Sequence, residues 1–385
     1  MRVPDVMKKS RSIGVDAARG IALIGLMIIH VLPGSNDEDE PTILWIVFSG
    51  HSAALFALLA GVSLAFSAGS QQLLKGTALR AARGSFAVRA ALITALGLLI
   101  AYADIPVAII LAYYGVMFML AIPLLRLSSR SLVLLAAGIA VVGPITVQLL
   151  RERMPEPGFN PTFTTLFTEP NVLLSELLLT GFYPALPYMT YLCAGLAIGR
   201  LNLQSRPVQF RVTLAGLVLT GSTWLLSALL LGPLGGMERL RESSDLAPET
   251  IDEMLIWGPE DYLPTTSLWW QTILSPYSTT VLEMLNTTGT SMAALGAVLL
   301  LTRIAAKALT PLAALGSMTL TLYSAHLLVL ATGFLEDQPV ASLVVQVAVG
   351  TIFAVLWGRT HNRGPLEGLV AIATKRTRAR LSGPI

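Results

Sequence analysis

Ten long apolar segments recur along this chain, and they constrain its fold more than any other feature. A helix that crosses a bilayer needs about 20 mostly apolar residues. Only 13% of the 385 residues are charged, about half the level that is typical of soluble domains. These features exclude an ordinary soluble protein and a disordered chain, and they predict an all-α, polytopic membrane protein with one transmembrane domain over residues 1–385. The expected spans are 15–33, 43–67, 86–103, 106–125, 131–150, 184–201, 208–231, 279–302, 310–333 and 340–358.

The positions of the basic residues predict how the spans are oriented. With both ends of the chain in the cytoplasm, 22 of the 26 Lys and Arg residues fall in cytoplasmic segments. Short cytoplasmic loops are enriched in Lys and Arg, and an odd number of spans would destroy this separation. We therefore expect ten spans with cytoplasmic termini in the plasma membrane. The four remaining basic residues, in the outer loops, are Arg151, Arg153, Arg239 and Arg241.

Three segments outside the regular spans carry additional expectations. The long loop 232–278 is predicted to be extracytoplasmic, and its Trp and Tyr residues fit either an interfacial aromatic belt or a lid that stacks on a sugar or lipid head group. Residues 172–201 are too long for one straight span, so we expect a break at Pro184 beside a cavity. The tail 365–385 combines apolar residues with a basic cluster, and this pattern predicts a cytoplasmic helix lying on anionic membrane lipids.

Ionisable residues within spans are costly and are functional candidates by default. Three of the four histidines, His30, His51 and His326, fall at a similar depth in the outer halves of three different spans. Each could be a hydrogen-bonded packing residue or a general base, since imidazole titrates near neutral pH. A three-histidine metal site is conceivable, but no supporting ligand pattern surrounds them and we expect no metal. Asp104, in the hairpin after the third span, could orient one of these imidazoles or simply be a solvated loop carboxylate.

Asp16 and Arg19 stand at the cytoplasmic end of the first span, three residues apart on one helical face. They could form an interfacial ion pair, or the guanidinium could hold a phosphate group. Arg19 precedes His30 by eleven residues, which is three turns and about 16 Å of helix, so both side chains point roughly the same way. A long carrier with a phosphate-bearing head and a reactive tip would span that distance.

A series of short motifs, in order along nearly the whole chain, resembles the transmembrane acyltransferases. These are the heparan-α-glucosaminide N-acetyltransferase type, its YeiB-like bacterial relatives and, more distantly, the bacterial sugar O-acyltransferases. The family's Trp-Asn-Gly segment is replaced here by Phe48-Ser49-Gly50-His51, so His51 competes with His30 for the catalytic role. The matching motifs lie at 14–23 with His30, 56–61, 103–105, 113–115, 183–188, 195–199, 311–316, 320–323 and 363–367.

The resemblance implies a cytoplasmic acyl-CoA donor, with acetyl-CoA the expected form, and an extracytoplasmic sugar or glycolipid acceptor with a hydroxyl or amine. Asp16 and Arg19 would hold the CoA end, and His30, His51, His326 and Asp104 are the catalytic candidates. Tyr188 and Tyr323 are the candidates for substrate binding and for donating a hydrogen bond to the oxyanion. No Gly-x-Ser-x-Gly motif occurs and the single cysteine, Cys193, sits in an apolar segment, which favours direct transfer without excluding an acyl-imidazole.

A second function class fits the same residues. A multi-pass transporter or lipid-handling protein with an outward polar cavity would also use membrane-embedded histidines and a broken sixth span, although no repeat between the two halves is evident. The expected partners are membrane lipids, acyl-CoA and a sugar or glycolipid, and no nucleic acid. Small-residue patches around Gly61 and Gly97 are compatible with a homodimer or with helix packing inside one chain.

Overall fold

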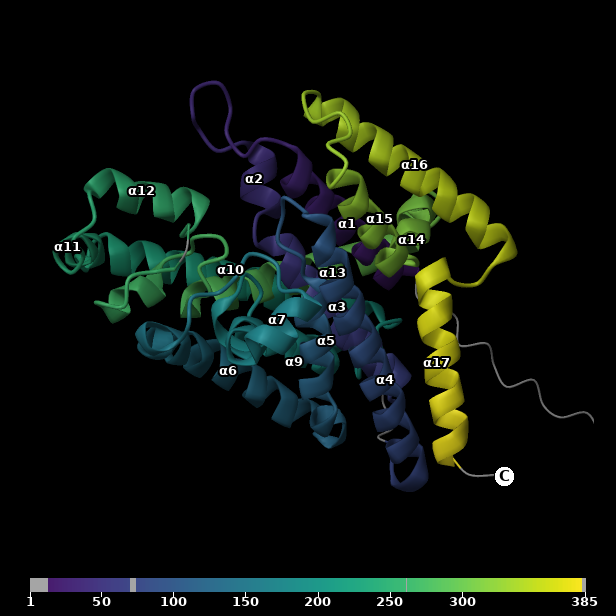
Figure 1. The fold of residues 1–385 in the computed structure, drawn as a ribbon. Helices are drawn as coiled ribbons and strands as arrows, with labels where there is room; N and C mark the ends of the chain where they lie inside the picture. The colour runs from purple at the N-terminus through teal and green to yellow at the C-terminus, as the bar shows by residue number, and fades with distance from the viewer. Residues whose placement is uncertain (1–12, 70–73, 261, 383–385) are drawn as a thin grey trace, which may run out of the picture.

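The computed structural model describes residues 13–69, 74–260 and 262–382, and this part of the chain folds into helices without a β-strand (Figure 1). The predicted all-α membrane fold is therefore confirmed. The basic residues before Ile13 and the last three residues of the predicted tail lie outside the described residues. The longer helices are α1 (Ile13–Val31), α3 (His51–Ser67), α4 (Gly76–Ile100), α5 (Leu111–Ala121), α6 (Ser129–Leu150), α9 (Ala185–Ile198), α10 (Arg206–Leu231), α12 (Pro248–Trp257), α13 (Val281–Ala305), α15 (Thr319–Leu330), α16 (Pro339–Thr360) and α17 (Pro365–Ser382).

Short helices connect these elements. They are α2 (Ile43–Phe48), η1 (Ala101–Ala103), η2 (Pro123–Arg126), η3 (Arg151–Arg153), α7 (Phe163–Thr168), α8 (Pro170–Ser175), η4 (Glu176–Thr180), α11 (Gly236–Glu242), η5 (Leu268–Thr272) and α14 (Thr310–Gly316).

Each of the ten predicted segments corresponds to an apolar helical element, but not all of them are simple spans. Within the described residues, seven helices are long and apolar enough to cross a membrane, and two bent pairs would bring the number to nine. The predicted break at Pro184 is confirmed, since α8–η4 and α9 meet at 46° and Pro184 is the residue before α9. The continuous span expected over 310–333 is wrong, because α14 and α15 meet at 78°. The segment 106–125 holds the 11-residue helix α5 and the start of η2, which is too short for a simple span.

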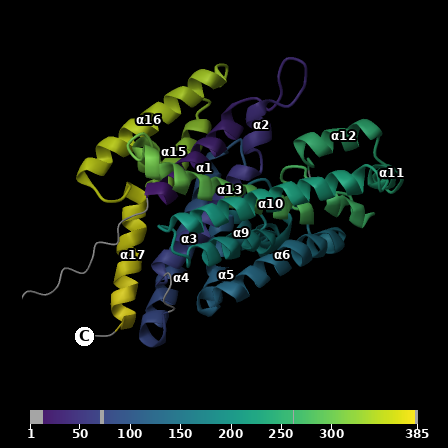
Figure 2. The ribbon, with the colours of Figure 1, turned by 180° about the vertical axis from the view of Figure 1, so that it is seen from behind.

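The bend between α14 and α15 follows from close packing against α1. A Cβ atom added to Gly316 would lie 1.7 Å from the carbonyl oxygen of Asp16, so the end of α14 lies directly against the α1 backbone. The chain turns after this contact, and α15 begins in a new direction beneath α16 (Figures 1 and 2). Apolarity alone gave no sign of this turn.

Backbone-to-backbone contacts at glycines set the spacing of the central helices. A Cβ on Gly195 of α9 would lie 1.8 Å from the carbonyl oxygen of Leu58 in α3, and one on Gly61 would lie 2.1 Å from that of Leu192. Gly97 meets Ala112 of α5 in the same way. Small residues let membrane helices approach closely. Gly61 and Gly97 are therefore used for packing within one chain.

Replacing Gly195 by valine is expected to separate α3 from α9 and to destabilise the protein by about 1–3 kcal/mol or more. The measurement is the thermal unfolding midpoint of the detergent-purified protein. Gly138→Val in α6 is the matched control, because nothing lies within 4 Å of a Cβ at Gly138. An equal loss of stability in both variants would contradict this account of the α3–α9 interface.

The loop 232–278 is a folded unit rather than an extended segment. Trp270 is fully buried in a small core with Leu240, Ile251 and Ile273. Trp257 packs against Trp45 with the two rings tilted and their centroids 5.4 Å apart. The unit lies at the end of α10, where α11 and α12 extend to one side in both views (Figures 1 and 2). Most of its aromatic rings thus have packing partners of their own.

Helix α17 packs along α4 instead of standing apart from the helix bundle (Figures 1 and 2). A Cβ on Gly84 would lie 2.3 Å from the Leu381 side chain, which places the end of α17 beside the first half of α4. The predicted helix in the tail is present, and one of its faces is covered by protein.

Candidate active site

A cavity of about 900 Å³ opens at the basic end of the bundle, the end at which α1, α4 and α10 begin. Its wall is built from residues of α1, α3, α4, α5, α14, α15 and α17 and of the loop 201–204. A volume of this size accommodates a cofactor-sized molecule. By the charge distribution along the chain, this end is predicted to face the cytoplasm.

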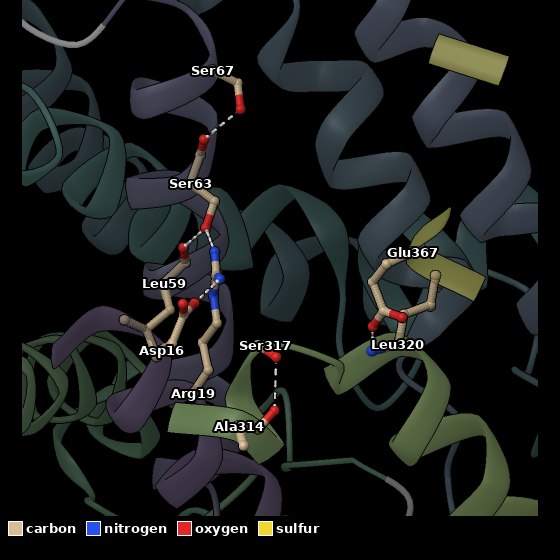
Figure 3. Close-up of polar contacts among 9 residues, drawn as sticks. All are labelled: Asp16, Arg19, Leu59, Ser63, Ser67, Ala314, Ser317, Leu320 and Glu367. Carbon is tan, nitrogen blue, oxygen red and sulfur yellow. Dashed lines mark hydrogen bonds and ion pairs between the residues drawn. The ribbon is translucent and has the colours of Figure 1, made fainter. Parts of the chain in front are cut away.

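Arg19 extends from α1 into the mouth of this cavity. Its guanidinium forms an ion pair with Asp16 at 2.8 Å and donates a hydrogen bond to the hydroxyl of Ser63 on α3. Asp16 and Ser63 are buried, whereas the Arg19 side chain retains 20% exposure toward the cavity. Figure 3 shows Arg19 held between these two partners, with Ser317 and Glu367 on other parts of the site. The predicted Asp16–Arg19 pair is therefore part of the cavity wall.

The remaining charges make the cavity strongly basic. Five basic side chains line it against two acidic ones, and one of the acidic pair, Asp16, is bound to Arg19. Arg89 of α4 lies near Arg19 and Arg363, stacks over the Phe118 ring at 5.1 Å, and has a buried Nε without a hydrogen-bond partner among the described residues. Such a cluster of cations attracts a polyanion. The basic side chains are Arg19, Arg89, Arg363, Lys375 and Arg378.

About two turns farther along α1 than Arg19 the lining is apolar, and Tyr323 is part of the same lining. Leu26, Phe56 and Ile110 belong to this part of the lining. Tyr323 is 3% exposed, and its hydroxyl accepts a hydrogen bond from the Ile110 N–H at 3.5 Å. The phenol proton is thereby left to donate elsewhere. A basic mouth followed by an apolar neck is complementary to a molecule with a charged head and an uncharged arm.

Behind Tyr323, two of the predicted histidines meet. The Nδ1 atom of His30 lies 3.1 Å from the Nε2 atom of His326, although the residues are 296 positions apart. The Tyr323 ring centroid lies 6.3 Å from that of His30 and 6.4 Å from that of His326. His326 is buried, and its Nδ1 lies 2.7 Å from Oε1 of Gln346 on α16. Tyr323 therefore stands between the cavity and a histidine pair.

The hydrogen-bond chain behind this pair fixes which ring nitrogen carries each proton. The chain ends on the carbonyl oxygen of Phe334, which can only accept, so Ser342 donates to it at 3.1 Å and accepts from Nε2 of Gln346 at 3.0 Å. Gln346 Oε1 must then accept from His326 Nδ1–H, and His326 Nε2 must accept from His30 Nδ1–H. The outcome is that Nε2 of His30 carries a lone pair, as a general base requires.

The third membrane histidine lies in a different contact. His51 Nδ1 is 3.0 Å from the hydroxyl of Thr290 on α13, and that hydroxyl donates to the Thr287 carbonyl at 3.1 Å. Its tautomer is therefore fixed in the same way as that of His30. Among the described contacts, none joins His51 to the His30–His326 pair or to Tyr323.

Two other predicted residues lie apart from the histidine pair. Asp104 is exposed at the end of η1 with a left-handed backbone (φ 51°), and its described contacts include none of the histidines. Tyr188 is buried in a tyrosine cluster, where its ring centroid lies 5.0 Å from that of Tyr191 and 5.9 Å from that of Tyr183.

The cavity expected beside the break at Pro184 is not the one described here, which lies at the other end of the helices. At the break itself, Glu176 accepts hydrogen bonds from Gly158 and Tyr113.

Several site residues were not among the sequence candidates. Gln346 could have been found from the sequence, because it is the single side-chain amide in the apolar segment 340–358. Arg89 stands within the predicted third span and was counted only as an orienting charge. Glu367, Lys375 and Arg378 are in the tail, whose approach to the cavity no local pattern reveals. No group of three or more His, Cys, Asp or Glu side chains that could hold a metal ion occurs in the described part of the chain.

Comparison with known proteins identifies the family. A model of the catalytic region of heparan-alpha-glucosaminide N-acetyltransferase matches residues 11–228, more than half of the chain. The matched region includes Asp16, Arg19, His30 and His51 and ends before α13, so His326 and α17 lie beyond it. No protein of curated function matches the chain. The chain is a multi-pass, acetyltransferase-type membrane protein that belongs to the heparan-alpha-glucosaminide N-acetyltransferase family.

Proposed function

We propose that this protein transfers an acyl group, in the simplest case acetyl, from cytoplasmic acyl-CoA to a hydroxyl or amine of a sugar or glycolipid on the extracytoplasmic side of the plasma membrane. The observation that carries the proposal is the cavity, whose basic mouth and apolar neck lead to Tyr323 and the His30–His326 pair. The phosphates of CoA fit the mouth, and its uncharged arm fits the neck. Modification of a cell-envelope glycan is the role that this reaction implies.

In this acyl transfer, each side chain of the site has one role. Nε2 of His30 removes the proton of the acceptor hydroxyl or amine as that atom bonds to the acyl carbon. The bond from the acyl carbon to the CoA sulfur then breaks, and the leaving thiolate takes up the proton held by His30. The Tyr323 hydroxyl, whose own proton is not used by Ile110, stabilises the negative charge on the acyl oxygen. His326 and Gln346 hold His30 in the required tautomer.

A transporter is the second candidate, and the two bent helix pairs favour it because broken spans are common at transport sites. The two proposals differ in what happens to the thioester. A carrier would bind an anionic solute and leave it intact, whereas a transferase must release free CoA.

The deciding experiment uses the full-length protein purified in lipid nanodiscs. Acetyl-CoA is expected to raise the thermal unfolding midpoint, and free thiol is expected to appear when glucosamine or a lipid extract from bacterial cell envelopes is added. Inorganic phosphate at equal ionic strength is the control for non-specific charge effects. If acetyl-CoA neither stabilises the protein nor loses its acetyl group with these acceptors, the transferase proposal is wrong.

A further inference from the structure

Helix α17 forms one wall of the cavity, although the sequence pattern predicts only a helix on the membrane surface. Its residues Ala371, Thr374, Lys375 and Arg378 line the cavity. Ala371, the adjacent pair Thr374 and Lys375, and Arg378 follow one another at intervals of about one turn, so they share one face of the helix. The neighbouring Arg376 and Arg380 are not part of the lining.

The start of α17 is fixed to the helix that carries the site. Glu367 accepts hydrogen bonds from the Leu320 N–H at 2.8 Å and the Thr321 N–H at 3.2 Å, and a third from the Thr321 hydroxyl at 2.6 Å. In return, the Thr321 hydroxyl accepts a bond from the Leu366 N–H at 3.0 Å. A carboxylate at a helix N-terminus satisfies the free N–H groups there. The first turn of α17 therefore lies against the first turn of α15, one turn or less from Tyr323.

This attachment sets the distance between the basic face and the reacting centre. From Glu367 to Arg378 the helix advances eleven residues, about 16 Å. The cations of α17 thus lie well away from Tyr323, toward the mouth of the cavity. A ligand that contacts both must have a long arm between its phosphates and its reactive carbon.

We propose that α17 is the phosphate-binding element of the donor site, with Lys375 and Arg378 contacting the phosphorylated nucleotide end of acyl-CoA. This inference rests on the proposed function and adds the residues that select the donor by its phosphates. Lysine and arginine together provide point-charge and bidentate contacts to phosphate oxygens. The same chemistry would bind anionic lipid head groups, and the test separates these two sources of phosphate.

The test compares two double variants of the same helix with the same loss of charge. Lys375→Gln/Arg378→Gln removes two positive charges from the face that lines the cavity. Arg376→Gln/Arg380→Gln removes two positive charges from the other side of the helix. In nanodiscs of phosphatidylcholine alone, titration calorimetry with CoA should give about tenfold weaker binding for the first variant and unchanged binding for the second. The loss should shrink as salt is added. Pantetheine, which has the uncharged arm of CoA without the phosphates, is the control for damage to the structure of the site. It should bind both variants equally.

The possible failures are distinguishable. If the wild-type protein binds CoA and both double variants bind it equally well, or equally poorly, α17 is not the phosphate-binding element and the proposed function stands. Weakened binding of the first variant to phosphatidylglycerol vesicles, with CoA binding unchanged, would assign the face to lipid and also overturn the inference. If the wild-type protein does not bind CoA at all, the proposed function and this inference are both wrong.

Discussion

Replacing His30 by glutamine should lower the rate of acyl transfer by about 100- to 10,000-fold while leaving the affinity for acyl-CoA unchanged. The expected range is that of a lost general base. Binding is preserved because His30 lies behind Tyr323 and is not part of the cavity lining. Release of CoA thiol from acetyl-CoA measures the rate, and calorimetric titration with CoA measures the affinity.

Three further variants define what the result means. His361→Gln is the matched control, because His361 is exposed at the end of α16 and should leave the rate unchanged. His326→Gln should lower the rate through loss of the hydrogen bond to His30, and the double variant should be no slower than His30→Gln, since residues that act as one unit are not additive. A His51→Gln protein that is inactive, beside a His30→Gln protein that is active, would transfer the catalytic role to His51.

Replacing Arg19 by glutamine should weaken acyl-CoA binding by about 10- to 100-fold, with a smaller effect on the rate at saturating donor. A hydrogen bond to a charged group contributes about 1.5–3 kcal/mol, and each 1.4 kcal/mol corresponds to a factor of ten. Arg19→Lys keeps the charge but loses the bidentate geometry, so it should bind with intermediate affinity. The measurement is calorimetric titration of the nanodisc-embedded variants with acetyl-CoA.

Two controls separate this effect from a loss of folding. Arg130→Gln removes an exposed cation at the same end of the helices and should not change the affinity. Asp16 is 5% exposed and forms an ion pair with Arg19, so Arg19→Gln removes this ion pair from a buried carboxylate and should lower the thermal midpoint. The double variant Asp16→Asn/Arg19→Gln should recover stability but not donor affinity. Unchanged affinity in a folded Arg19→Gln protein would remove Arg19 from the binding site.

The sequence predicted the α1 residues of the candidate site better than the residues that other helices contribute. Arg19 and His30 share one helix, so their separation and common direction follow from helical geometry alone. The partner of His30 could be limited to the membrane histidines because so few ionisable residues enter the spans. Nothing local could choose between His51 and His326, since that choice depends on which helices are neighbours. Asp104 was expected to orient an imidazole because it carries a negative charge. The side chain that contacts the imidazole of His326 is instead the uncharged amide of Gln346.

The sequence by itself determined that this chain is a helical membrane protein, and it predicted which end of each span faces the cytoplasm. These properties depend on apolar length and on the distribution of charge, which can be read one segment at a time. Only the tertiary structure decided the bend between α14 and α15, the pairing of His30 with His326, and the position of α17 at the cavity. Each of these depends on close contacts between helices far apart in the chain, such as Gly316 against the α1 backbone and Glu367 against the first turn of α15. Such contacts arise from packing and hydrogen bonding in three dimensions, and no periodicity along the sequence encodes them.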